Sequence, residues 1–309
     1  MKKQPALDWL IPLIALLAIF AAGIGLFYQD GGSAYTFTTL RGQVVQIYGR
    51  GLYRYDTIMT AAGFKGVDVV TLVVGLPLLL VSYVFYRRGS TRGGLLLAST
   101  LTYFLYIGAS MTFSAAFNSL FLVYVALFSA GLFAFVTALS MFDMGTLAER
   151  LSTRLPHGGL AAFMFVAGLG TFLLWLSELV GPIMTGQAPE NLGPYTTMFT
   201  HGFDSAVITP SAALAGVCLL KRKPLGYLLA APLLVMCTLN GAAVISSTIS
   251  QTLSGIIFPI GVYIGMVGSW VLMGAFAIWL AVIFFRGLPS SPGGQMANKA
   301  GSASQPMRG

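Results

Sequence analysis

The sequence is poor in charge. Only 8% of its residues are Asp, Glu, Lys or Arg, against roughly 25% in a typical soluble domain. Hydrophobic residues make up 56% of the 309-residue chain, and the mean hydropathy is +0.82. So few charges cannot cover the surface of a soluble protein. The composition therefore excludes a soluble enzyme and predicts an all-α integral membrane protein.

Cysteine and histidine are also scarce. The two cysteines, Cys218 and Cys237, both lie in apolar runs, and the chain has no CxxC motif. As helical residues they fall at different depths, so we expect no disulfide between them. The two histidines, His157 and His201, are too few and too far apart for a haem or a histidine-rich metal site. We therefore expect no cofactor and no metal ion.

The motifs of common catalytic centres are missing as well. The sequence has no GxSxG, HExxH or P-loop motif, and its last apolar run has no lysine for a retinal Schiff base. The net charge of +8 does not indicate a nucleic-acid partner, because the basic residues cluster at the ends of apolar runs. These absences favour a protein that is not an enzyme, without indicating any particular activity.

What the sequence does have is eight apolar runs of membrane-spanning length. A helix needs about 20 mostly apolar residues to cross the hydrocarbon core. The runs cover residues 9–28, 69–86, 95–113, 120–142, 160–182, 205–220, 225–247 and 256–285. The first run follows Lys2 and Lys3 and could be a signal peptide. It is long for one and lacks a small-x-small cleavage site, so we interpret it as a retained helix.

The basic residues predict an orientation. If the N-terminus is cytoplasmic, every Lys and Arg except Arg41, Arg50, Arg54 and Lys65 lies on the cytoplasmic side. Those four share one long outer loop, where the positive-inside rule has less weight. We therefore expect eight helices in the cell membrane, with both termini cytoplasmic.

The outer loop, residues 29–68, is the longest non-membrane segment. The stretches 35–40 and 43–48 flank Arg41-Gly42 and predict a small β-hairpin. The segment 48–56 is rich in Tyr and Arg, and Asp56 or Thr57 could cap a short helix over 58–62 that ends at Gly63. The aromatic content argues against disorder. The loop is then either a folded lid or a structure packed at the membrane surface.

The chain is expected to form one polytopic domain, 1–286, followed by a disordered cytoplasmic tail, 287–309. A short amphipathic helix is predicted at 145–154. A weak internal similarity relates the stretch from Asp68 through Tyr86-Arg-Arg to Gly94 with the stretch from Asp204 through Lys221-Arg-Lys to Gly226. It suggests two four-helix halves in the same orientation, 1–142 and 159–286.

Candidate site residues gather on one side of the membrane. The middle of the predicted bilayer carries no ionisable side chain, which argues against a proton pump with a buried carboxylate. Polar residues collect at the outer ends of the helices, where they could line an outward-facing pocket roofed by the Tyr/Arg-rich loop. The candidate ligand-binding residues are Glu178, His201, Asp204, Asp68, Asn240, Arg50, Arg54 and Tyr53.

Each of these residues also has a purely structural interpretation. Asp68 and Asp204 could cap helix N-termini, and Glu178 could reach water or pair with Arg50 or Arg54. His201 could be solvated in a loop, and Asn240 could form an interhelical hydrogen bond. A metal site built from Glu178, His201 and Asp204 has suitable ligand types, but its spacing matches no known ligand pattern.

Three functions remain open. We favour a non-enzymatic membrane protein whose outer pocket takes a small ligand, a lipid or a partner membrane protein. A small-molecule or lipid transporter of two four-helix halves is the alternative, and it requires a polar cavity reaching past mid-membrane. A membrane-embedded enzyme using Glu178, His201 and Asp204 comes third. Membrane lipids are the only partners that the sequence itself indicates.

Overall fold

Eight long apolar helices make up most of the structure, a computed structural model that describes residues 2–143 and 155–288. By length and composition each of the eight could cross a membrane, as the sequence predicts. Their bounds, numbered as spans, are Leu7–Phe27 (span 1, α1), Ile58–Arg87 (span 2, α2 and α3), Thr91–Ser114 (span 3, α4), Phe121–Leu139 (span 4, α5), His157–Thr185 (span 5, α7), Phe199–Leu220 (span 6, α8 and α9), Pro224–Leu253 (span 7, α10) and Ile260–Gly287 (span 8, α11 and α12).

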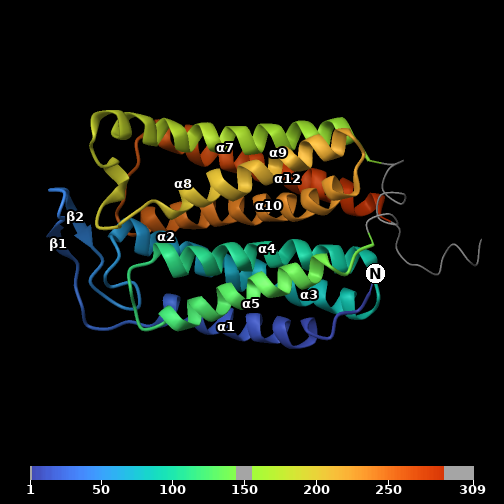
Figure 1. The fold of residues 1–309 in the computed structure, drawn as a ribbon. Helices are drawn as coiled ribbons and strands as arrows, with labels where there is room; N and C mark the ends of the chain where they lie inside the picture. The colour runs from blue at the N-terminus through green and yellow to red at the C-terminus, as the bar shows by residue number, and fades with distance from the viewer. Residues whose placement is uncertain (1, 144–154, 289–309) are drawn as a thin grey trace, which may run out of the picture.

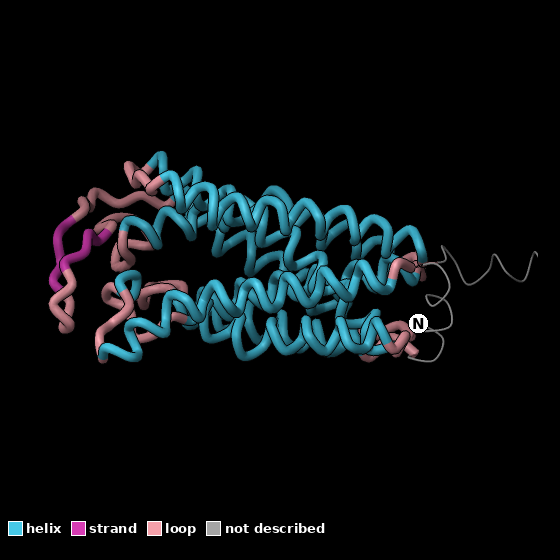
Figure 2. Tube along the Cα trace, turned by 90° about the horizontal axis from the view of Figure 1, so that it is seen from above, coloured by secondary structure: helices cyan, strands magenta, loops and turns pink. Residues whose placement is uncertain are grey.

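The spans lie alongside one another in a single bundle (Figures 1 and 2). In Figure 1 spans 5–8 form one group above spans 1–4, and α10 packs against both α2 and α4 where the groups meet. The β-hairpin lies at one end of the bundle, which we call the hairpin end. The N-terminus lies at the other, the terminal end, and so does Leu288, whose carbonyl accepts a hydrogen bond from Arg92.

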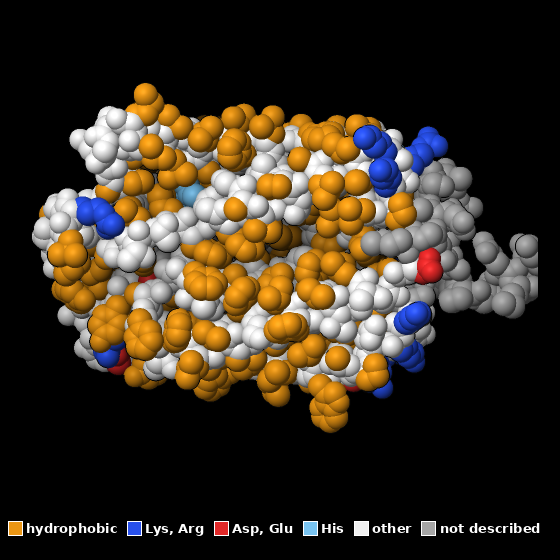
Figure 3. All heavy atoms as spheres, viewed as in Figure 1, with side chains coloured by type: hydrophobic (Ala, Val, Ile, Leu, Met, Phe, Trp, Pro, Cys, Tyr) orange, Lys and Arg blue, Asp and Glu red, His pale blue; other side chains and the backbone are white. Residues whose placement is uncertain are grey.

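The surface suits a membrane environment. The face in Figure 3 carries hydrophobic side chains along the length of the bundle, while Lys and Arg gather near its two ends. Large apolar side chains point outward from several spans; Phe20 is 51% exposed and Phe133 61%. Exposed apolar surface on this scale is unusual for a soluble monomer. A lipid-facing exterior accounts for it.

The outer loop contains the predicted hairpin. Strand β1 (Tyr35–Thr38) pairs antiparallel with β2 (Val44–Ile47), and Gly42 in the connection has a φ of +79°. The short helix begins after Thr57, as predicted. The prediction that it ends at Gly63 is wrong, because the helix continues through Gly63 to Arg87. Gly66 in the same helix allows span 2 to pack closely on span 7, because a Cβ at this position would lie 2.4 Å from the Ser247 backbone.

Three spans contain a π-helical segment: Thr71–Gly75, Asp204–Ile208 and Tyr263–Val267. In the first two cases a proline follows closely, Pro77 and Pro210. Proline lacks an N–H and its ring clashes with the carbonyl four residues earlier. A local widening of the helix relieves that clash, so these spans continue through their prolines.

The turns joining spans 2 and 3 and spans 6 and 7 have the same hydrogen bonds. In the first, Arg88, Gly89 and Ser90 donate their N–H groups to the carbonyls of Val84, Tyr86 and Phe85. In the second, Lys221, Arg222 and Lys223 donate to Val217, Leu219 and Cys218. Gly89 (φ +78°) and Arg222 (φ +51°) both adopt the left-handed conformation. The residue numbers of the second turn all exceed those of their counterparts in the first turn by the same amount, which we call the offset.

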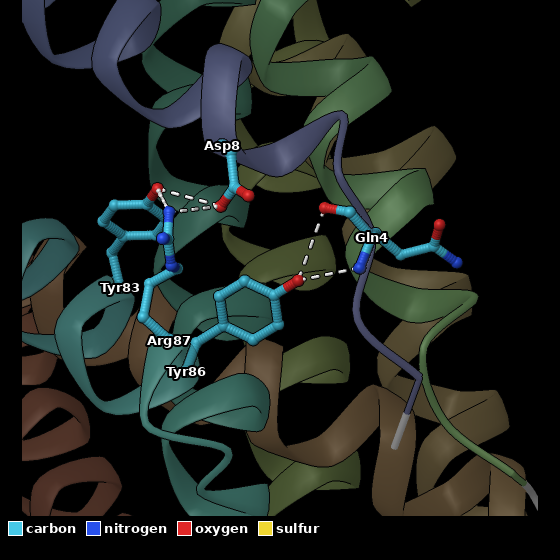
Figure 4. A network of polar contacts seen from close by, with 5 residues as sticks. All are labelled: Gln4, Asp8, Tyr83, Tyr86 and Arg87. Atoms are coloured by element: carbon cyan, nitrogen blue, oxygen red, sulfur yellow. Dashed lines mark hydrogen bonds and ion pairs between the residues drawn. The ribbon is translucent and has the colours of Figure 1, made fainter.

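A polar network joins spans 1 and 2 at the terminal end (Figure 4). The Tyr86 hydroxyl accepts a hydrogen bond from the Gln4 N–H at 2.9 Å. Asp8 accepts from Arg87 at 2.9 Å and from Tyr83 at 3.0 Å. These contacts fix the first helix against the second. The predicted helix at 145–154 and all of the predicted tail beyond Leu288 lie outside the described residues.

Candidate functional site

A large cavity opens at the hairpin end. Its volume is about 780 Å³, and spans 2, 3, 5, 6, 7 and 8 all contribute residues to its lining. Strand β2 and the segment 190–195 border it on the loop side. Four of the predicted site residues, Glu178, His201, Asp204 and Asn240, line this one cavity. They come from the fifth, sixth and seventh spans, so the fold unites residues that are far apart in the sequence.

Glu178 and His201 form a pair inside the cavity. The His201 Nε2 lies 3.0 Å from the Glu178 Oε2, and the Trp175 ring lies 4.1 Å from the His201 ring, centroid to centroid. His201 is only 9% exposed, so the expectation of a solvated loop histidine is wrong. The alternative pairing of Glu178 with Arg50 or Arg54 is also wrong, because span 6 supplies the partner.

Asp204 lies deeper on the same span. Its side chain is buried within a continuous helix, so the interpretation as an N-cap is wrong. The Trp175 Nε1–H donates a hydrogen bond to the Asp204 Oδ2 at 3.1 Å, and Tyr106 also faces this carboxylate. The Asp204 Oδ1 is buried without a hydrogen-bond partner among the described residues. This buried oxygen therefore keeps unused hydrogen-bonding capacity in a residue that borders the cavity.

Asn240 lies about halfway along span 7 and lines the same cavity. Among the described residues its amide makes no hydrogen bond, so the expected interhelical bond is not formed. Asp204, Asn240 and Trp270 also border a second, smaller cavity of about 50 Å³, whose other lining residues are mostly apolar. The polar lining therefore ends at the depth of Asp204 and Asn240.

Asp68 and Tyr53 lie together, away from the cavity. The Tyr53 hydroxyl donates a hydrogen bond to the Asp68 Oδ2 at 2.7 Å, and both side chains are buried. Asp68 is in the interior of span 2, so its expected role as an N-cap is wrong; Thr57 caps that helix by accepting the Thr60 N–H at 3.1 Å. A Cβ on Gly25 of span 1 would touch both the Asp68 carboxylate and the Tyr53 hydroxyl. The pair joins the outer loop to spans 1 and 2.

Arg50 and Arg54 belong to the outer loop and make their contacts within it. Arg54 pairs with Asp30, whose other carboxylate oxygen accepts the Gly51 N–H at 2.7 Å. The Gly51 N–H and the Arg54 charge lower the pKa of Asp30. The Arg50 guanidinium lies 4.9 Å from the centre of the Tyr48 ring. The segment 48–56 does not border the cavity, so the expectation that it forms the roof is wrong.

The two sides of the cavity mouth are joined at Asp56. The Asp56 Oδ1 accepts hydrogen bonds from the Tyr195 hydroxyl and from the Ala116 N–H, both at 2.9 Å. Nearby, the Gln43 side chain donates to the Pro189 carbonyl at 3.0 Å. Complete burial of the Asp56 side chain raises its pKa to about 7. The hairpin, the start of span 2 and the loop before span 6 are thereby held together.

The sequence reasoning missed three residues that shape the site: Trp175, Tyr106 and Tyr195. Trp175 precedes Glu178 by one helical turn, so the two share a face of span 5. That spacing could have identified it. Tyr106 is one of many aromatic residues in apolar runs, and Tyr195 lies in an irregular loop. Neither position carries a sequence signal for its contacts.

The described residues indicate no particular activity. Among the described residues no three His, Cys, Asp or Glu side chains are placed to hold a metal ion. No family model, curated protein or solved structure matches the chain. The class to which it belongs follows from the fold: it is a polytopic membrane protein with eight candidate spans.

Proposed function

We propose that the chain is a cell-membrane protein that binds a small amphipathic ligand in the cavity at its hairpin end. The cavity itself carries the proposal: about 780 Å³ lies within the 300–1,000 Å³ typical of small-molecule sites. Its lining combines a few polar groups, among them Asn240, His201 and Gln251, with aromatic side chains such as Trp270 and Phe64. That combination suits a molecule with one polar end.

The proposed orientation puts this cavity on the outside. Eight spans bring both ends of the described chain to the same side, and in the sequence the Lys and Arg residues outside the outer loop all fall in or next to the connections on that side. The positive-inside rule favours a cytoplasmic terminal end. The cavity mouth would then face the external solution, where a ligand enters without crossing the membrane.

We also propose that spans 1–4 and 5–8 are two halves of one repeat. The matching turns and the two proline-associated π segments support it, and so does the packing of span 3 on span 4 and of span 7 on span 8. A Cβ on Gly108 would lie 2.7 Å from the Phe128 backbone in the first half, and a Cβ on Gly241 would lie 3.2 Å from the Gly274 backbone in the second. Gly108 and Gly241 are related by the same offset as the turn residues.

A difference between the proposed halves explains where the cavity lies. Gly66 lets span 2 pack directly on span 7 at Ser247. At the equivalent position span 6 has Phe199, whose ring stacks on Phe113 of span 3 at 5.9 Å. A phenylalanine keeps spans 6 and 3 further apart than a glycine would. The space that results is part of the cavity.

Native mass spectrometry of the purified protein tests the proposal. Ser110 lines the cavity, so Ser110→Trp should fill part of it and abolish any co-purified small molecule that the wild type retains. Leu122→Trp is the control, because Leu122 is 76% exposed on span 4. Both variants should elute as single species in size-exclusion chromatography. A bound species that survives Ser110→Trp, or a wild type that retains nothing and binds no added ligand, would overturn the proposal.

A further inference from the structure

We infer that the cavity selects organic cations, with Asp204 as the counter-charge for an ammonium group. The inference rests on the proposed binding function and names the chemical class of its ligand. It starts from the charge of the lining. Glu178, Glu190 and Asp204 all border the cavity, whereas no Lys or Arg does so among the described residues. An anionic ligand would meet only repulsion from these carboxylates, apart from the single His201.

Asp204 is the acid that lacks a counter-charge. Glu178 already faces His201 at 3.0 Å, and Glu190 is exposed at the edge of the cavity. Asp204 is 3% exposed, its Oδ2 accepts the Trp175 N–H, and the Tyr106 phenol faces the carboxylate, but neither of these partners carries a positive charge. A buried carboxylate is costly unless it is paired or hydrogen-bonded on all sides. A ligand ammonium group would supply the missing charge.

The aromatic lining favours the same class. Trp175, Trp270, Tyr106 and Phe64 all border the cavity. Aromatic faces attract cations through their ring quadrupole, and tryptophan does so best; quaternary ammonium groups are commonly bound in this way. A carboxylate beside several aromatic rings therefore offers a cation both charge neutralisation and a surface that replaces its hydration. The wide apolar part of the lining would hold the ligand's body.

A set of three probes of similar size tests this inference on the full-length protein in lipid nanodiscs. Benzyltrimethylammonium carries the charge, neopentylbenzene is its neutral carbon analogue, and benzenesulfonate is an anion. Binding is measured by titration calorimetry. The cation should bind at least tenfold more tightly than either of the other probes. Equal or tighter binding of the neutral analogue, or no binding of the cation, would overturn the inference without any variant being needed.

Two variants then test whether Asp204 is the counter-charge for the bound cation. Asp204→Asn keeps the shape and should weaken benzyltrimethylammonium binding at least tenfold, while Asp8→Asn makes the same substitution at the terminal end, outside the cavity, and should change it less than threefold. Unchanged binding to Asp204→Asn contradicts the assignment. If all probes fail to bind the wild type while Ser110→Trp still loses a co-purified molecule, the cavity binds ligands but not cations. If all probes bind equally to the wild type and to Ser110→Trp, the cavity itself is not the site.

Discussion

At the scale of single residues, Asp56 is the clearest candidate for a pH-sensitive contact. It joins the start of span 2 to Tyr195 across the cavity mouth, and its pKa of about 7 is well above the roughly 3.9 of an unfolded chain. The titratable groups around it are the phenols of Tyr53, Tyr124 and Tyr195. Burial raises the pKa of Tyr53 and Tyr195 above the already basic value of a free phenol. None of these phenols changes charge near neutral pH.

The sign of the pH dependence follows from linkage. The folded state binds the Asp56 proton more tightly than the unfolded state does, so the resulting stabilisation is complete below about pH 4 and is lost as the pH rises through about 7. We expect the thermal unfolding temperature of the wild type in detergent to fall between pH 5 and pH 8. In Asp56→Asn the amide oxygen can still accept both hydrogen bonds but the side chain does not titrate, so the unfolding temperature should depend less on pH. The same slope in the variant as in the wild type would show that Asp56 is not the group responsible.

How much of the site could be predicted is also a matter of single residues. The sequence places Glu178, His201, Asp204 and Asn240 at one end of the bundle, because polar residues in apolar runs are easy to see. It does not reveal how each helix is rotated. Asp68 is predicted beside the same pocket, yet it points toward Tyr53 and span 1. Only the packing of the spans separates a cavity residue from a buried structural pair.

At the scale of elements, the contact between spans 2 and 7 depends on one glycine. A Cβ at Gly66 would meet the Ser247 backbone at 2.4 Å, which a side-chain movement cannot relieve. Gly66→Ala should therefore push the two spans apart and lower stability by about 1–3 kcal/mol. A Cβ at Gly23 in span 1 would meet nothing within 4 Å, so Gly23→Ala is the matched control and should have no destabilising effect.

Thermal unfolding in one detergent, with both variants at the same concentration, measures this difference. Equal stability of Gly66→Ala and Gly23→Ala would mean that spans 2 and 7 are not packed as described. Ligand binding provides a second readout. Ser247 lines the cavity, so a displacement of span 7 in Gly66→Ala should also change binding there.

The extent of the helices shows where hydropathy alone fails. Hydropathy predicts span 2 over 69–86, but the helix begins at Ile58, and it predicts a start at 205 for span 6, which begins at Phe199. Lys65 and Asp68 interrupt the apolar pattern, yet the outer loop satisfies both: Lys65 donates to the Tyr48 hydroxyl at 2.7 Å, and Asp68 accepts from Tyr53. A helix can continue past its apolar run when neighbouring segments supply polar partners. The hairpin, by contrast, follows local turn chemistry, and its predicted strand ends agree with the structure to within two residues.

At the scale of the whole molecule, three features combine. Eight spans bring both ends of the described chain to the side opposite the hairpin, the cavity opens at the hairpin end, and acidic residues line it. The number of spans could be predicted because each needs only length and hydropathy. The cavity could not, since it depends on an unequal spacing between spans that are distant in sequence.

The most direct measurement is the accessibility of single cysteines in intact cells. In a background with Cys218 and Cys237 replaced by alanine, Asn191→Cys places a thiol beside the cavity mouth and Lys223→Cys places one in the turn between spans 6 and 7. A membrane-impermeant maleimide should label the Asn191→Cys protein in intact cells, and the Lys223→Cys protein only after the cells are permeabilised. The reverse pattern would put the cavity on the cytoplasmic side and contradict an outward-facing binding site.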